Sequence, residues 1–116
     1  MDLRRAGPIE GPQLTGFRGT ALLIDGEAWA GAVIVTPTGV RAWDGIDPTA
    51  AADIDPPPEF ILFGSGRTLA RPDPAIVEAL EARGIGIEAM DTRAAARAWT
   101  LLRSEGRWIS AALRGL

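Results

Sequence analysis

Three consecutive prolines, Pro56 to Pro58, separate two parts of the sequence that have different hydrophobic patterns. Proline interrupts regular structure because it lacks an amide proton and fixes φ. Before this break, short apolar runs alternate with turn signals, which is typical of antiparallel β-structure. After it, continuous apolar runs alternate with amphipathic segments, which is typical of α/β proteins. The sequence therefore predicts a β-rich first part and an α/β second part.

The first part is predicted to form an antiparallel β-meander over residues 17–43. The run at 21–24 ends at Asp25-Gly26, a strong signal for a two-residue hairpin turn. A β-branched run follows within residues 28–36, and a turn separates it from a third strand at 40–43. Asp47-Pro48 then predicts a short helical turn, with Asp47 as its N-cap.

The second part is predicted to contain three strands and two helices. Residues 60–63 are apolar on both faces, as in a strand that is covered on each side. Further strands are expected at 85–90 and 107–113, with helices near 74–83 and 92–105. Asp73 and Asp91 are expected to cap the two helices. If the strands are parallel, the crossovers are right-handed.

A chain of 116 residues is typical of one domain, so residues 1–116 are expected to form a single α/β domain. Residues 1–16 are rich in Gly and Pro and show no clear period, which predicts a loosely ordered lead-in.

Several kinds of catalysis are excluded by residue types that the chain lacks. The sequence contains no Cys, His or Lys, so all 12 cationic side chains are Arg. This excludes disulfides, Cys nucleophiles, Lys Schiff bases, Ser-His pairs and thiolate or imidazole metal sites. The acidic loop at Asp44, Asp47, Asp53 and Asp55 could bind a hard cation through its oxygens, but its spacing does not match the EF-hand loop, so a solvated loop is preferred. No metal, no cofactor and no catalytic residue is predicted.

The charge and hydropathy of the chain bear on its partners and location. The net charge is −3, which gives no support for nucleic-acid binding. No apolar run approaches the roughly 20 residues of a spanning helix, so we expect a protein that is not integral to the membrane. The first five residues lack the apolar region of a secretory signal. We expect a cytoplasmic protein, either free or peripheral to the inner membrane.

Four short stretches resemble one small protein family. They are residues 63–66, residues 87–92 with Ala95, residues 102–107, and Gly39-Val40 with Trp43. Over roughly residues 15–115, the chain resembles the family of short uncharacterised bacterial and archaeal proteins to which the mitochondrial assembly factor three of respiratory complex I belongs. The resemblance implies a small three-layer α/β fold with a mixed central sheet and an N-terminal antiparallel β-meander flank. It also implies assembly work with a protein partner at a membrane respiratory complex, whereas the prokaryotic members have no settled activity.

The candidate site lies where two predicted strands end. Gly64-Ser65-Gly66-Arg67 follows the first strand, and Asp91-Thr92-Arg93 follows the second. Parallel neighbouring strands would bring both segments to one edge of the sheet, where ligands bind in open α/β folds. Helix amides and the two arginines could then hold a phosphate or a carboxylate.

Two interpretations of this site remain open. The glycines could serve only to turn the chain sharply, and Asp91 would oppose an anion while it caps its helix. Alternatively, residues 64–67 and 91–93 form a cleft for an anion or for a protein partner. The chain is accordingly interpreted as a non-enzymatic binding or assembly module, and the alternative is a small anion-binding or metabolite-binding protein, or an enzyme.

Overall fold

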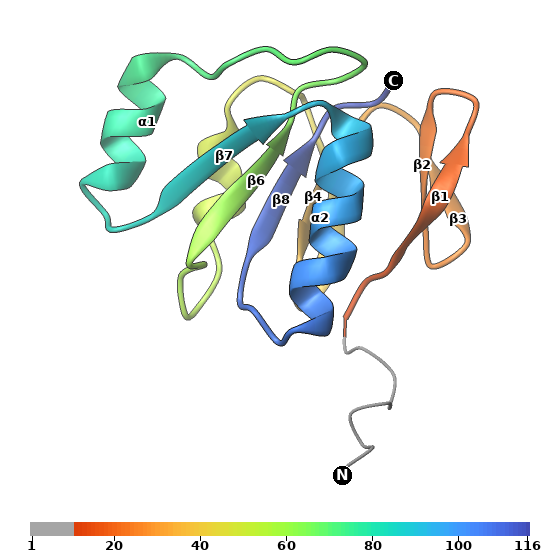
Figure 1. Cartoon of the computed structure of the whole chain (residues 1–116), viewed down its shortest axis with the longest axis horizontal. Coiled ribbons are helices and arrows are strands. Elements are labelled where there is room, and N and C mark those ends of the chain that lie inside the picture. Colours follow the sequence, from red (N-terminus) through yellow and green to blue (C-terminus); the bar gives the residue numbers. More distant parts are fainter. Residues whose placement is uncertain (1–10) are drawn as a thin grey trace, which may run out of the picture.

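The computed structural model describes residues 11–116, and Figure 1 shows their arrangement. Three strands form an N-terminal sheet, and five strands form a central sheet. The strands are β1 (Leu14–Arg18), β2 (Ala21–Ile24), β3 (Glu27–Trp29), β4 (Ala32–Thr36), β5 (Gly39–Trp43), β6 (Phe60–Gly64), β7 (Gly86–Met90) and β8 (Ser110–Leu113). The helices are α1 (Pro74–Glu81), α2 (Thr92–Ser104) and a short 3-10 helix, η2 (Pro48–Ala52).

The N-terminal sheet is an antiparallel meander in the order β1-β2-β3. Asp25 and Gly26 both have positive φ, as the predicted hairpin turn between β2 and β3 requires. The prediction of a loosely ordered lead-in over residues 1–16 is wrong for residues 14–16, which belong to β1. Residues 1–10 of that segment lie outside the described residues. The pairing of β1 with β2 shifts register between Leu14 and Gly16. This irregularity breaks the alternation by which a strand is recognised in a sequence.

The predicted meander is shorter than expected, because β4 and β5 belong to the central sheet. The chain leaves the N-terminal sheet at Gly31, which has positive φ, and β4 then pairs antiparallel with both β5 and β8. Val33, Ile34 and Val35 are all buried, as expected for a strand covered on both faces. Pairing with β8 places β4 in the central sheet. The residues of 28–36 give no sign of this pairing, because β8 lies far away in the sequence.

The central sheet is mixed and has the order β5-β4-β8-β6-β7. Strand β6 pairs with β7 on one side and with β8 on the other, so the three strands expected after the prolines share one sheet, and both pairings are parallel. Strand β8 is shorter than the predicted 107–113 and occupies the middle of the sheet. Backbone bonds continue beyond it: the Arg114 amide donates to the Gly64 carbonyl, and the Leu116 amide donates to the Thr20 carbonyl.

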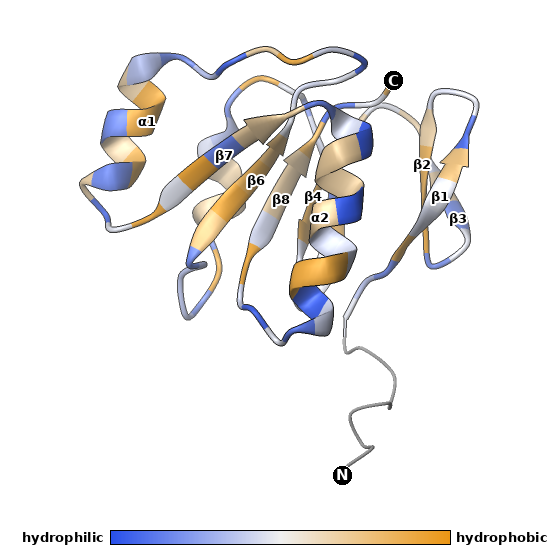
Figure 2. Ribbon diagram, in the orientation of Figure 1, coloured by the Kyte–Doolittle hydropathy of each residue, from blue (hydrophilic) through white to orange (hydrophobic). Residues whose placement is uncertain are grey.

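Two apolar clusters cover the two faces of the central sheet. On one face, Trp99 of α2 and Leu22 of β2 pack against Leu62 of β6. On the other face, Leu80 of α1 and Ala51 of η2 pack against Ile61. Figure 2 shows the apolar colouring along the strands between these layers. The three-layer α/β fold with an antiparallel flank is therefore confirmed. No helix within residues 11–116 has the length and apolar character to cross a membrane.

Candidate functional site

The loop after β6 meets the start of α2, as the parallel pairing of β6 and β7 predicted. The Ser65 amide donates to the Met90 carbonyl at 2.9 Å. The Gly66 amide donates to Thr92 Oγ1 at 2.8 Å, and the Thr92 amide donates back to the Gly66 carbonyl at 2.8 Å. Gly64, Ser65 and Gly66 are thus in direct contact with the end of β7 and the first residue of α2.

Thr92 links three segments of the chain. Besides accepting from Gly66, its hydroxyl donates to the Arg114 carbonyl at 2.8 Å, and the residue is 0% exposed. Gly64 lies so close that a Cβ at this position would be 2.9 Å from Thr92 Oγ1 and 2.8 Å from Leu113 Cδ2. A side chain therefore does not fit at Gly64, and the glycine allows β6, β8 and α2 to approach one another.

Ser65 shapes the loop rather than facing solvent. Its hydroxyl donates to the Thr68 carbonyl at 2.7 Å and accepts from the Ala70 amide at 2.8 Å. The residue is only 8% exposed. The hydrogen bonds of the Ser65 hydroxyl to Thr68, Met90 and Ala70 are all to backbone groups, and none of these groups is a base that could activate it as a nucleophile.

The polar groups at the start of α2 are also engaged within the protein. The Asp91 carboxylate caps the helix by accepting from the Ala94 amide at 3.0 Å, and the Thr92 amide is bonded to Gly66. Helix α1 begins only beyond residues 65–73 and packs on the opposite face of the sheet. Arg67 and Arg93 remain exposed, so an anion at this edge would be held by their guanidinium groups more than by helix amides.

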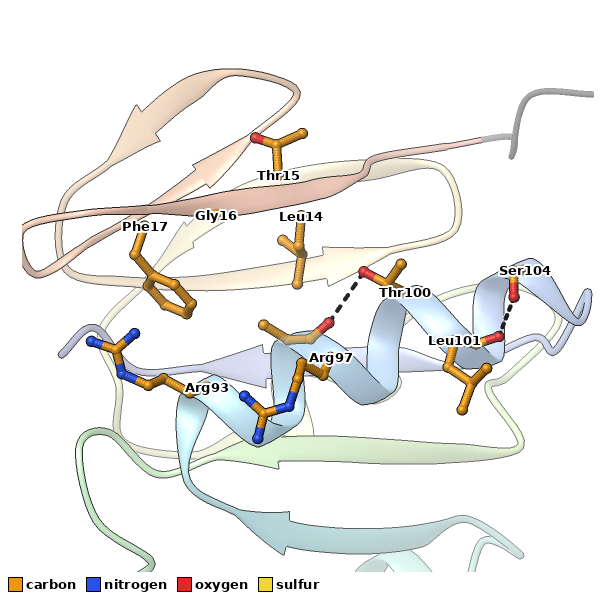
Figure 3. A pocket seen from close by; sticks show the side chains of 10 residues that line it. Leu14, Thr15, Gly16, Phe17, Arg93, Arg97, Thr100, Leu101 and Ser104 are labelled. Atoms are coloured by element: carbon orange, nitrogen blue, oxygen red, sulfur yellow. Dashed lines mark hydrogen bonds between the residues drawn. The ribbon is translucent and has the colours of Figure 1, made fainter.

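A second candidate surface is a groove of about 640 Å³ between β1 and α2. Figure 3 shows Leu14 and Phe17 pointing from β1 toward the helix. The lining residues are Leu14, Thr15, Gly16, Phe17, Arg93, Ala96, Arg97, Thr100, Leu101 and Ser104. Leu101 is 60% exposed and adds an accessible apolar side chain to the lining of this groove. This groove combines exposed apolar surface with two arginines.

The cations and hydroxyls of this groove have distinct roles. The Arg93 guanidinium lies over the Phe17 ring, 5.1 Å from its centroid, and Arg97 follows one turn later. Thr100 and Ser104 donate to carbonyls of their own helix, to Ala96 and Leu101 respectively. Sequence reasoning placed Arg93 in a site but missed the rest of the groove. An outward-facing leucine at position 101, beside Thr100 and Arg97, was the available signal.

Other candidate residues have structural roles. Asp44 accepts from the Ile46 amide and Asp47 from the Thr49 amide, so these carboxylates order the acidic loop. No cluster of His, Cys, Asp and Glu that could hold a metal occurs in residues 11–116. At the other end of β6, Arg107 donates twice to Glu59, and this contact lowers the pKa of the Glu59 carboxyl.

Comparison with known proteins identifies relatives over almost the whole chain. Residues 14–114 match the family model described as a protein of unknown function, DUF498/DUF598. An uncharacterized protein of Rhodobacter capsulatus is 33% identical over 107 residues, which are 91% of this chain and 82% of that protein.

Two solved structures show the same fold at similar identity. A crystal structure from Bordetella parapertussis has a TM-score of 0.84 at 30% identity and covers 95% of this chain and 100% of its own. A solution structure from Bordetella pertussis, described as a Mth938-like domain, has a TM-score of 0.75 at 27% identity. The match covers 89% of this chain and 85% of the Bordetella pertussis chain.

Proposed function

Because this chain belongs to the DUF498/DUF598 family of proteins of unknown function, we propose that it is a non-enzymatic binding module that assists the assembly of a larger complex. The observation that carries the proposal is the groove between β1 and α2, which presents apolar side chains beside two arginines. The resemblance to a respiratory complex I assembly factor suggests the kind of complex. Its place of action would be the cytoplasmic face of the inner membrane.

The residues favour binding over catalysis. The chain lacks the Cys, His and Lys side chains that most often act as nucleophiles or bases. The hydroxyls of Ser65 and Thr92 are engaged in hydrogen bonds that hold the fold together. The remaining exposed groups are suited to recognising a partner, since arginine is enriched among the residues that dominate binding energy at interfaces.

The chemistry of the groove indicates its partner. Leu14, Phe17 and Leu101 offer apolar surface, and Arg93 and Arg97 can bind carboxylates in bidentate geometry. The complementary partner is an acidic amphipathic segment, with apolar side chains that enter the groove and Asp or Glu that meet the arginines. The Phe17 ring beneath Arg93 holds one guanidinium in position, which reduces the entropy lost on binding.

Replacing Leu101 with aspartate is expected to weaken partner binding at least about tenfold, because a carboxylate would replace the exposed apolar anchor and alter the charge of the groove. The measurement is affinity capture of tagged protein from cells of the native organism, with quantitative mass spectrometry of respiratory complex I subunits. Ile46→Asp is the matched control, since Ile46 is also an exposed apolar residue but does not line the groove.

The possible outcomes test the role of the groove and the identity of the complex independently. Equal recovery of complex I subunits with Leu101→Asp and the wild type would contradict the role of the groove. Recovery of other proteins that depend on Leu101, without complex I subunits, would keep the groove and reject the complex I assignment. Enrichment of no protein above the background of an untagged strain would reject the binding module.

A small-anion site at the edge of the central sheet is the second candidate function. It is favoured by the contact of Gly64, Ser65 and Gly66 with Thr92, which keeps the loop beside the start of α2. Exposed Arg67 and Arg93 flank this contact in sequence, while Asp91 opposes an anion there. On this alternative the protein would bind, or act on, a small phosphorylated or carboxylated metabolite.

A thermal-shift screen of phosphorylated and carboxylated metabolites tests this second candidate. A ligand present at 100 times its dissociation constant is expected to stabilise the protein by about 2.7 kcal/mol. Arg67→Ala is expected to remove that stabilisation, whereas Arg83→Ala, at an exposed arginine near the end of α1, should leave it unchanged. A ligand that stabilises Arg67→Ala as strongly as the wild type would show that the loop is only a turn.

A further inference from the structure

Strand β7 forms an unpaired edge of the central sheet. In the part of the chain that the structure describes, β7 pairs only with β6. The hydrogen bonds at the two ends of this pairing show which residues face β6: the Gly86 amide donates to the Glu59 carbonyl, and the Met90 carbonyl accepts from the Ser65 amide. Backbone groups alternate in direction along a strand, so the amides and carbonyls of Ile87 and Ala89 face away from the sheet.

This edge lies at the bottom of a groove between the two helices. One cavity of about 580 Å³ is lined by Val77 and Glu81 of α1, by every residue of β7 except Ala89, and by Leu102 of α2. A second cavity of about 540 Å³ lies between α1 and β7; it adjoins the first at Val77, Ile87 and Glu88, and Ala89 also lines it. A chain added at this edge would therefore find space for its side chains in two adjoining cavities.

The charge of the groove indicates what it binds. Glu78, Glu81 and Glu88 line the two cavities and are exposed. Arg71 is the cation that lines the α1 side, and Glu59, at the end of the groove, is paired with Arg107 at 2.8 Å. The surroundings of β7 are therefore negative overall, whereas the groove between β1 and α2 carries arginines.

We propose that the β7 edge binds an extended segment of another protein, which adds to the sheet as a further strand and carries Lys or Arg between apolar residues. Backbone bonds to Ile87 and Ala89 supply the pairing, and the acidic side chains select the basic sequence. A second copy of this chain is a poorer occupant, because antiparallel pairing of two β7 strands about their centres would bring two Glu88 side chains together. This surface is separate from the groove of the proposed function.

The test uses a fluorescein-labelled octapeptide of alternating valine and arginine, with an alternating valine and glutamate peptide for comparison. Fluorescence anisotropy is expected to show binding of the arginine peptide and not of the glutamate peptide. Glu88→Arg should weaken binding at least about tenfold, as should Ala89→Pro, which removes an outward amide without breaking the pairing with β6. Glu27→Arg is the charge control, because Glu27 is exposed on β3, in the other sheet.

Amide hydrogen exchange in the wild-type protein provides a readout that does not depend on the folding of a variant. Saturation with the arginine peptide should slow exchange at Ile87 and Ala89 far more than at Glu88, whose amide faces β6. The proposal is overturned if neither peptide binds at millimolar concentration, or if binding leaves the amides of Ile87 and Ala89 unprotected. It is also overturned if sedimentation shows a dimer that Glu88→Arg or Ala89→Pro dissociates, since a second copy would then occupy the edge.

Discussion

Replacing Trp99 with alanine is expected to lower the free energy of unfolding by about 3–5 kcal/mol. Trp99 is 1% exposed and packs among Leu22, Val33 and Leu62, so it joins α2 to both sheets. Its indole nitrogen also donates to the Pro12 carbonyl at 3.2 Å, which fixes the chain just before β1. Alanine would leave a large cavity and one unpaired carbonyl. Urea denaturation followed by circular dichroism measures the loss.

Two further variants serve as comparisons for Trp99→Ala. Leu101→Ala, on the exposed side of the same helix, should change stability by less than about 0.5 kcal/mol, although the groove proposal makes it a binding residue. Trp99→Phe should retain most of the packing and lose the hydrogen bond to Pro12. A loss below about 1 kcal/mol in Trp99→Ala would mean that α2 presents a different face to the sheet.

Thr92→Val is expected to destabilise the protein by about 2–5 kcal/mol, although valine has nearly the same shape as threonine. The substitution removes the group that pairs with both the Gly66 amide and the Arg114 carbonyl, and Thr92 has no exposed surface through which water could replace it. Each buried polar group left without a partner costs about 1–3 kcal/mol. Chemical denaturation gives the energy, and amide exchange at Gly66 reports the local opening.

The matched control for this substitution is Thr100→Val, at an exposed threonine of the same helix that donates only to the Ala96 carbonyl. Thr100→Val should be nearly neutral. Thr92→Ser should recover most of the lost stability because it restores the hydroxyl. Equal effects of valine at positions 92 and 100 would show that the contacts of Thr92 with Gly66 and Arg114 contribute little to the fold.

The helices were predictable because their signals are local. Asp73 and Asp91 accept hydrogen bonds from the Ala75 and Ala94 amides, as their positions before Pro74 and Thr92 indicated. The doubly apolar run that became β6 also identified a covered strand without knowledge of its partners. Membership of β4 in the central sheet was not predictable, since it depends on pairing with β8.

The candidate sites were predictable to different extents. Parallel strands at 60–63 and 85–90 were enough to predict that Gly64-Ser65-Gly66 would meet Asp91-Thr92. The sequence could not show that the Thr92 hydroxyl is fully engaged in hydrogen bonds to Gly66 and Arg114. A threonine that binds a ligand and a threonine buried between segments of the chain cannot be distinguished by residue type alone. The groove between β1 and α2 was missed because β1, which forms one of its walls, was not recognised in the sequence. The register shift at Gly16 interrupts the alternating pattern that would have indicated this strand.

The middle position of β8 has a consequence for synthesis on the ribosome. Residues 110–113 lie between β4 and β6, so the central sheet is two separate pieces until this late segment has emerged. During translation, the β4–β5 hairpin and the β6–β7 pair have unpaired strand edges and exposed apolar side chains until β8 joins them. Chains in such a state are prone to aggregate. The central sheet can therefore close only after residues 110–113 have left the ribosome, and the two earlier pieces need protection from aggregation until then.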